Sequence, residues 1–278
     1  MATARTQTLL KTDAPADAKG TSPAPGDSYV QSFARGLEVI RSFSAQSPRQ
    51  TLSEVAGRTG LTRAGARRIL LTLQTLGYVE SDGKLFRLTA RMLDLGFAYL
   101  SSLPIWNLAE PIMEALVGQV KESCSAAVLD GTDIVYVLRV PTHKIMSIGL
   151  GVGSRLPAYC TSMGRMLLSA LPQDQMMQVL QASDRTARTR YTVTDINDLA
   201  AKIAQVRKQG WSLVNQELEE GLVSMAAPIT DRAGQTVAAL NISGQANRTS
   251  AKAMQETMLP ALLEAARSIS QRLSLQRN

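Results

Sequence analysis

The sequence predicts an α+β fold in two parts: a small helical part that ends in a β-hairpin, and a larger part in which an antiparallel sheet is flanked by helices. Up to Gly77, apolar residues recur at helical spacing, and two short strand-like runs follow. Beyond residue 122, strand-like and helical segments alternate irregularly, which favours an antiparallel sheet. The 278 residues, 45% of them hydrophobic, suffice for two domains.

Two helices open the first part. Residues 32–43 are expected to form a helix, because four apolar residues recur at helical spacing: Phe33, Leu37, Ile40 and Phe43. A second helix begins at Thr51, because Glu54 three residues later completes a capping box. Gly60 ends it, since glycine tolerates the positive φ of a tight turn.

A third helix and a hairpin follow. Thr62 is the expected N-cap of this helix, and Gly77 ends it. Asp82-Gly83 is a hairpin turn signal between a strand that begins at Val79 and a strand over 85–88. Two helices, a short turn, a helix and a hairpin make up a winged helix-turn-helix.

The larger part contains both strands and helices. We predict a tail at 1–27 that is too polar to fold, a winged helix-turn-helix over 28–88, a linker helix within 89–102, and a second domain over 103–278. The expected helices beyond the hairpin cover 89–101, 105–122, 162–170, 173–181, 195–209 and 250–275. The expected strands cover 123–130, 133–140, 145–153, 211–216, 222–230 and 236–243.

The positive charge is concentrated in the smaller part. The formal net charge is +7. Residues 28–102 hold ten Lys and Arg against five Asp and Glu, whereas residues 103–278 hold seventeen against fifteen. A polyanion such as DNA would meet this excess on the N-terminal part. The aromatic content of 4% argues against a single-strand binding platform of stacked rings.

The third helix is the first candidate binding site. Arg63, Arg67 and Arg68 lie toward its outer side with Thr62, and arginine in the major groove can bridge O6 and N7 of guanine. Four further candidates for contact with DNA flank it: Thr51 and Ser53 at the start of the second helix, and Lys84 and Arg87 on the wing. The alternatives are a solvated helix face and a winged helix that contacts only protein.

The segment 151–168 is the second candidate site. Thr161 and Ser162 would open a helix whose free N–H groups suit a carboxylate, and Arg155 could add positive charge. The alternative is a structural turn capped by Thr161. A phosphate-binding P-loop is excluded, because no Gly-Lys-Ser/Thr follows the glycines.

An enzyme is the weaker interpretation. Cys160 or Ser162 with His143, the sole histidine, could act as nucleophile and base, but Ser162 lacks a G-x-S-x-G elbow. We expect no catalytic residues, metal or cofactor, because Cys124, Cys160 and His143 are too few and too scattered. The sequence also shows no signal peptide and no membrane span, and we expect a cytoplasmic protein with reduced thiols.

The sequence resembles the IclR family of bacterial regulators. Within that family it is similar to the subgroup that controls aromatic-acid breakdown through the β-ketoadipate pathway, the protocatechuate and 4-hydroxybenzoate regulators. The resemblance spans nearly everything after residue 28, and RLPAYCTSMGR is specific to the subgroup. The matching stretches are YVQSFARGLEVI, GLTRAGARRILLTLQTLGYV, FRLTARMLDLGFAYLSS, DIVYVLRV, IMSIGLGVGSRLPAYCTSMGRMLL, QELEEGL and AALNISG.

The resemblance implies an architecture and a ligand class. It implies a winged helix-turn-helix, a linker helix and a GAF-like effector-binding domain. It also implies homodimers that join through their DNA-binding parts, often paired into tetramers, and a small organic acid as effector.

The resemblance also implies where the effector binds. The family's pockets match Ile148, Ser162, Met163, Val214, Leu222, Ser224, Asn241 and Ser243 in this sequence. Some relatives that bind small keto acids have an acidic residue where Val214 stands and Ser where Asn241 stands. The apolar Val214 suits an aromatic ring or a longer aliphatic acid.

Together these observations predict a transcription regulator that binds double-stranded operator DNA and responds to a carboxylic acid: protocatechuate, 4-hydroxybenzoate or β-ketoadipate. The acid would change operator affinity or contact with RNA polymerase by shifting the spacing of two winged helices in a dimer. The alternatives are a ligand-sensing module that acts through protein contact and a small-molecule hydrolase.

Overall fold

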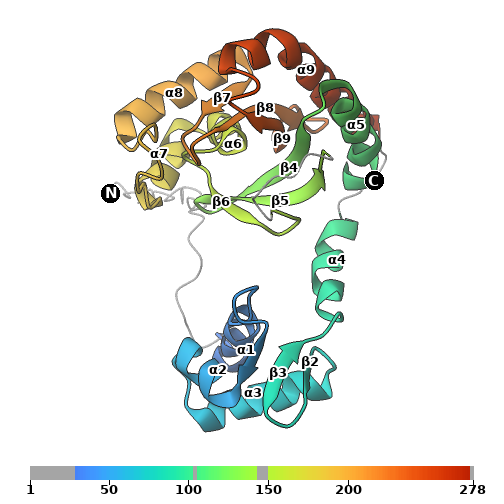
Figure 1. Cartoon of the computed structure of the whole chain (residues 1–278), viewed down its shortest axis with the longest axis vertical. Helices are drawn as coiled ribbons and strands as arrows, with labels where there is room; N and C mark the ends of the chain where they lie inside the picture. The colour runs from blue at the N-terminus through green and yellow to red at the C-terminus, as the bar shows by residue number, and fades with distance from the viewer. Residues whose placement is uncertain (1–28, 103–104, 143–149, 276–278) are drawn as a thin grey trace, which may run out of the picture. The chain divides into compact units, whose positions relative to one another are not determined.

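The computed structural model describes residues 29–102, 105–142 and 150–275, and the chain divides into two compact units between Leu95 and Gly96 (Figure 1). The division falls within helix α4 (Met92–Ser102). The predicted tail at 1–27 and most of the predicted strand at 145–153 lie outside the described residues.

The first unit contains the predicted helices and hairpin. The three helices are α1 (Gln31–Arg41), α2 (Leu52–Thr59) and α3 (Arg63–Thr75). The strands are β1 (Arg49–Thr51), β2 (Val79–Ser81) and β3 (Leu85–Leu88), in the antiparallel order β1-β3-β2. Strand β1 was not predicted, because three residues are too few to show an alternating pattern. The winged helix-turn-helix is therefore confirmed.

The helices of the first unit bury different shares of their apolar side chains. Helix α3 buries Ala66, Leu70 and Leu73, as its spacing predicts. Helix α1 buries only Val39, whereas Phe33 is 69% exposed and Leu37 is 42% exposed. The predicted helix is present, and its apolar side chains have two environments: Ile40 and Phe43 pack against the core, whereas Phe33 and Leu37 face solvent.

The second unit is a six-stranded antiparallel sheet between two layers of helices. Its strand order is β6-β5-β4-β9-β8-β7. The strands are β4 (Ser123–Asp130), β5 (Asp133–Val140), β6 (Arg155–Pro157), β7 (Ser212–Asn215), β8 (Leu222–Thr230) and β9 (Thr236–Gln245). The helices are α5 (Ile105–Val120), α6 (Ser162–Ala170), α7 (Gln173–Ala182), α8 (Ile196–Gln209) and α9 (Ala251–Leu275).

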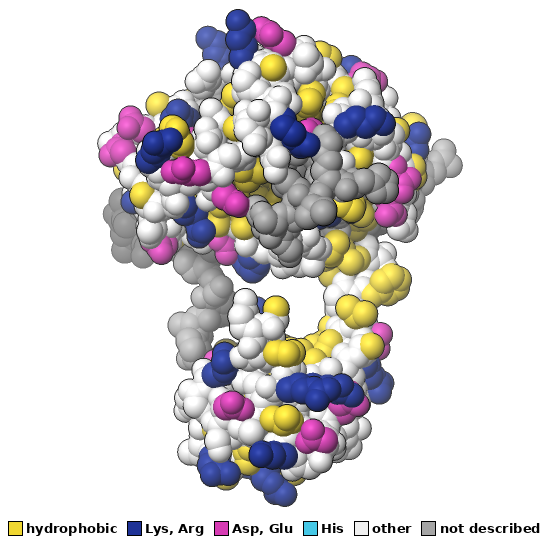
Figure 2. All heavy atoms as spheres, viewed as in Figure 1, with side chains coloured by type: hydrophobic (Ala, Val, Ile, Leu, Met, Phe, Trp, Pro, Cys, Tyr) yellow, Lys and Arg dark blue, Asp and Glu magenta, His cyan; other side chains and the backbone are white. Residues whose placement is uncertain are grey.

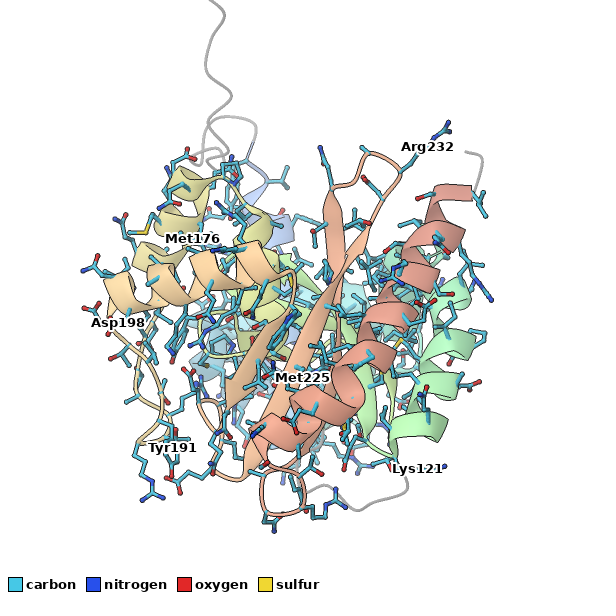
Figure 3. The ribbon with its side chains drawn as sticks, turned by 90° about the horizontal axis from the view of Figure 1, so that it is seen from above. Lys121, Met176, Tyr191, Asp198, Met225 and Arg232 are labelled. Carbon is cyan, nitrogen blue, oxygen red and sulfur yellow. The ribbon has the colours of Figure 1, made fainter. Side chains whose placement is uncertain are left out.

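Each face of this sheet has its own hydrophobic core. Helices α5 and α9 cover one face (Figures 1 and 3). Met225 on β8 and Leu240 on β9 belong to the core on this side. Helix α6 lies on the other face, in a core that includes Ala127, Ala226 and Ala239, while α8 packs against α6 and α7 packs against α8. The small residues on this second face let α6 approach the sheet closely, and the candidate ligand cavity lies on this side.

No helix in the described ranges is both long enough and apolar enough to cross a lipid bilayer.

Candidate nucleic-acid interface and ligand cavity

Helix α3 presents three arginines to solvent. Thr62 caps the helix by accepting a hydrogen bond from the Gly65 amide at 3.1 Å, so the first turn is fixed. Arg63, Arg67 and Arg68 are exposed, and none of them makes an ion pair with a described residue. Figure 2 shows Lys and Arg side chains on the surface of this unit, with some acidic side chains among them. The arginines of α3 are thus free to bind an anionic surface.

The start of helix α2 is occupied by its own capping box. The Thr51 amide and hydroxyl both donate to the Glu54 carboxylate, at 2.7 and 2.8 Å. These hydrogen bonds, the backbone one first, lower the pKa of Glu54. A negative charge therefore already lies where we expected a phosphate beside Thr51. Ser53 is exposed on the first turn.

Two cations of the wing differ in their pairing: Lys84 forms no ion pair with a described residue, whereas Arg87 does. Asp82 accepts hydrogen bonds from the amides of Lys84 and Leu85, at 3.0 and 2.8 Å, which orders the turn. Lys84 is exposed at that turn. Arg87 on β3 forms an ion pair with Glu80 on the neighbouring strand β2. Lys84 is therefore the freer of the two predicted wing contacts.

A groove with an apolar lining runs between α1 and α3 in the first unit. Phe33 and Leu37 of α1 contribute to it, together with Ile69 and Leu76 of the α3 region. The exposed stripe of α1 thus continues onto a second helix, instead of being an isolated patch.

The second unit contains a cavity between the sheet and the start of α6. Its lining draws on six elements, β5, β6, α6, β7, β8 and β9, and on the loops beside them. The lining residues are Tyr136, Arg139, Leu150, Leu156, Cys160, Thr161, Ser162, Met163, Val214, Leu218, Leu222, Ser224, Asn241 and Ser243.

The structure brings together seven of the nine effector-binding residues expected from the sequence. They are Ser162, Met163, Val214, Leu222, Ser224, Asn241 and Ser243. Arg155 is placed elsewhere: it is exposed on β6 and bonds Asp130 at 2.6 Å and Asp133 at 3.2 Å. Ile148 lies outside the described residues. The sequence did not indicate Tyr136, Arg139 or Leu218 as lining residues.

The start of α6 is held tightly in place. Thr161 caps the helix by accepting from the Gly164 amide at 3.2 Å, and its hydroxyl donates to the Pro157 carbonyl at 3.0 Å. A Cβ at position 164 would overlap the Ala158 carbonyl oxygen, so only glycine fits there. Ser162, 1% exposed, faces the cavity at the first turn, where amide N–H groups favour an anion or a hydrogen-bond acceptor.

Asn241 and Ser243 are hydrogen-bonded polar residues of the cavity lining. Asn241 on β9 accepts a hydrogen bond from the Ser125 amide on β4 at 3.0 Å and donates to the Ser243 hydroxyl at 2.9 Å. Ser125 is also the register partner of Arg139 on β5. These polar groups stand among apolar side chains, as in sites that bind small organic molecules.

A buried ion pair joins α6 to the turn that carries Leu218. The Arg165 guanidinium bonds both carboxylate oxygens of Glu217, at 2.7 and 2.6 Å, and also the Tyr159 carbonyl at 2.9 Å. Glu217 in turn accepts from the Val193 amide at 3.0 Å. Both charged side chains are less than a tenth exposed. The pair therefore fixes one cavity wall relative to another.

Burial keeps two ionisable groups of the cavity neutral. It raises the pKa of Tyr136 to about 12, against an opposing effect of the nearby Arg139. It also raises the pKa of Cys160 to about 11, so this side chain is a thiol and not a nucleophilic thiolate at neutral pH. His143, its imagined base, lies outside the described residues. No group of three metal-ligating side chains occurs in the described part of the chain.

Comparisons with known proteins agree on one family. Residues 32–83 match the IclR helix-turn-helix domain, and residues 97–271 match the domain described as bacterial transcriptional regulator IclR C-terminal. The chain is 44% identical over 246 residues to the Pca regulon regulatory protein of Pseudomonas putida. This alignment covers 88% of this chain and 84% of that protein.

Two solved structures extend the similarity to three dimensions. A chain from Rhodococcus sp. RHA1, assigned as a transcriptional regulator, has a TM-score of 0.80 and 51% identity over 88% of this chain and 98% of its own. An IclR homolog from Microbacterium hydrocarbonoxydans, solved in complex with 4-hydroxybenzoate, has a TM-score of 0.77 and 26% identity. The match covers 87% of this chain and 98% of the homolog.

Proposed function

The chain belongs to the IclR family of bacterial transcriptional regulators, and from that premise we propose which of its residues bind operator DNA and which bind the effector. It is a DNA-binding regulator that responds to an aromatic acid, and not an enzyme. We assign operator recognition to α3 and acid binding to the cavity beside α6.

The observation that carries the DNA assignment is the exposed arginine face of α3. Arg63 and Arg67 are four residues apart and share one side of the helix, next to the rigid Thr62 cap. A recognition helix contacts base edges with its N-terminal residues, which is where these side chains stand. Lys84 at the wing tip and Ser53 on α2 are placed to contact phosphates, whereas Thr51 and Arg87 already have partners within the protein.

Operator fragments selected from a random DNA library test this assignment. Arg67→Ala should weaken binding by about 1–3 kcal/mol and relax the preferred sequence, as expected when a base contact is lost. Lys84→Ala should weaken binding evenly across sequences and lower the slope of affinity against salt. The control is Arg232→Ala, on the exposed β8–β9 turn. Unchanged affinity for alanine variants of Arg63, Arg67 and Arg68 would remove α3 from the interface.

The same measurement separates a DNA-binding regulator that uses α3 from a module that acts only through protein contact. The second kind of protein would show no salt-dependent DNA binding. Transcription with purified RNA polymerase would then show whether the bound regulator recruits or blocks the polymerase.

The effector assignment is supported by the composition of the cavity. Val214, Leu218 and Leu222 supply an apolar wall, and Ser162 and Asn241 supply polar groups, so a small acid with an apolar body is complementary to it. The 4-hydroxybenzoate complex of the Microbacterium homolog supports the same ligand class. We therefore propose protocatechuate, 4-hydroxybenzoate or β-ketoadipate.

Thermal unfolding with each of these three acids tests the effector assignment. An acid at a hundred times its dissociation constant should stabilise the protein by about 2.7 kcal/mol. Asn241→Leu should remove the stabilisation, because it replaces the amide with an apolar group in the cavity lining. No shift with any of the three acids would contradict the assignment.

Self-association through the first unit is supported by the apolar stripe on α1. Phe33 and Leu37 are exposed and line the groove between α1 and α3, and a surface of this kind is typical of a protein interface. We propose a homodimer, with tetramers formed from dimers. Phe33→Glu should shift the sedimentation coefficient toward that of the next smaller species. The control is Val152→Glu, which lies in the second unit and is also exposed.

A further inference from the structure

Strand β5 contains an irregularity that changes the direction of one arginine. Opposite β4, Tyr136 pairs with Ala127 and Leu138 pairs with Ala126, so Val137 is an extra residue without its own partner. Successive side chains of a strand point to opposite faces, and one extra residue reverses the alternation beyond it. Tyr136 and Arg139 are three apart and would lie on opposite faces of a regular strand.

The burial pattern shows the reversal directly. Tyr136 packs in the core under α6, whereas Val137 and Leu138 both pack against the core under α5 and α9. Arg139 then returns to the side of Tyr136, and both line the cavity. The bulge therefore turns the Arg139 guanidinium toward the ligand cavity. Bulges next to functional sites commonly re-aim a side chain in this way.

Arg139 has little within the protein to bind. Its one hydrogen bond in the described residues is a long one, from Nη1 to the Ser125 hydroxyl at 3.5 Å. Among the described lining residues it is the only charged side chain, and no described carboxylate pairs with it. Arg155, by contrast, is fully engaged with Asp130 and Asp133. Arg139 thus leaves most of its five N–H donors available to a ligand.

We propose that Arg139 binds the carboxylate of the effector, and that the start of α6 at Ser162 receives a second acceptor group of the same molecule. This inference rests on the proposed effector site. A half-buried guanidinium in an apolar cavity gains most from an anion, and a carboxylate matches its planar fork in two parallel hydrogen bonds. The favoured effectors are then hydroxy acids or dicarboxylic acids, with a simple monocarboxylate such as benzoate binding less tightly.

Titration calorimetry with acids and their carboxamides tests the proposal. The full chain is titrated with 4-hydroxybenzoate and 4-hydroxybenzamide, with protocatechuate and its amide, and with β-ketoadipate and its monoamides. The variants are Arg139→Gln and Arg139→Lys, and the control is Arg232→Gln on the exposed turn between β8 and β9 (Figure 3). The carboxamide keeps the shape of the acid, but it removes the charge and replaces one acceptor oxygen with an NH2 donor.

Wild type should prefer the acid over its amide, and Arg139→Gln should weaken acid binding by about 10- to 100-fold. Amide binding should change by less than about twofold, because the guanidinium gains little from a neutral group. The acid affinity of Arg139→Lys should fall between those of wild type and Arg139→Gln, since lysine keeps the charge but loses the planar pair of N–H donors.

Two results would overturn the proposal. One is an acid preference that survives Arg139→Gln. The other is an equal loss for acid and amide in both variants, which would make Arg139 only a structural residue. If wild type binds none of the acids, the proposed effector site falls as well. If wild type binds an acid and only the Arg139 result fails, the effector site stands and the inference falls.

Discussion

The two units place their functional side chains in opposite ways. In the first unit, Arg63, Arg67 and Arg68 follow one another on a single exposed helix. In the second unit, the cavity takes Arg139 from β5, Ser162 from α6 and Asn241 from β9, which are far apart in the sequence. Substitutions on α3 should therefore change binding and leave the fold intact, whereas substitutions around the cavity should affect both.

The largest effect is expected at the buried ion pair. Arg165→Met leaves the Glu217 carboxylate buried without its partner, and such changes typically cost about 3–5 kcal/mol. Urea denaturation of the whole chain would measure the loss. The first unit offers no comparable site among its described ion pairs, all of which are exposed. A loss below about 1 kcal/mol would show that the cavity walls do not depend on this pair.

A smaller effect is expected at the cap of the recognition helix. Thr62→Ala removes the acceptor for the Gly65 amide and should cost about 1 kcal/mol of stability. Operator affinity should fall with it, because the first turn carries Arg63. Thr62→Ser keeps the acceptor and serves as the control. Equal affinities for the two variants would separate the cap from DNA binding.

A pH-dependent effect is expected at the start of α2. The pKa of Glu54 is lowered in the folded protein by hydrogen bonds from Thr51. A carboxylate with a lowered pKa stabilises the fold above its unfolded pKa of about 4.3, and this stabilisation disappears as the pH falls through the folded pKa. Glu54→Gln should therefore lower stability at pH 7 more than at pH 3 in unfolding measurements. Equal losses of stability at both pH values would show that the negative charge of Glu54 does not stabilise the fold.

The smallest effect is expected at Arg155. This residue is exposed, and surface ion pairs contribute about 0–1 kcal/mol. Arg155→Gln should therefore change stability by less than about 0.5 kcal/mol and leave effector affinity within about twofold. Calorimetry beside Arg139→Gln gives a direct contrast between the two arginines. A large loss of acid binding in Arg155→Gln would restore this residue to the effector site.

Local signals in the sequence were sufficient for most of the fold. The capping box at Thr51 and the cap at Thr62 are contacts within three residues, and both occur as predicted. Helix α6 and strands β4, β5 and β8 also have the predicted bounds. The exposure of Phe33 and Leu37 on α1 was not predictable, because apolar residues that face solvent have the same helical spacing as residues that face a core.

The cavity was predictable only in part, for a different reason. The resemblance to a known family supplied seven lining residues that the structure brings together. The alternation of side chains along DIVYVLRV could not place Arg139 on the cavity side. In a regular strand Arg139 would face away from Tyr136, and the extra residue Val137 reverses this. Arg155 was predicted to bind the effector because it lies in the loop before α6. Its two partners, Asp130 and Asp133, come from the β4–β5 hairpin, and no local pattern links them to Arg155.

Control of DNA binding by the cavity is tested most directly by the dissociation constant of an operator fragment, selected from random DNA, with and without a saturating acid. We expect protocatechuate, 4-hydroxybenzoate or β-ketoadipate to change this constant by at least about fivefold for the wild type, which is the lower range of allosteric coupling. Arg139→Gln should need about 10- to 100-fold more acid to reach the same change. An operator affinity that none of the three acids alters would contradict the claim that the cavity controls DNA binding.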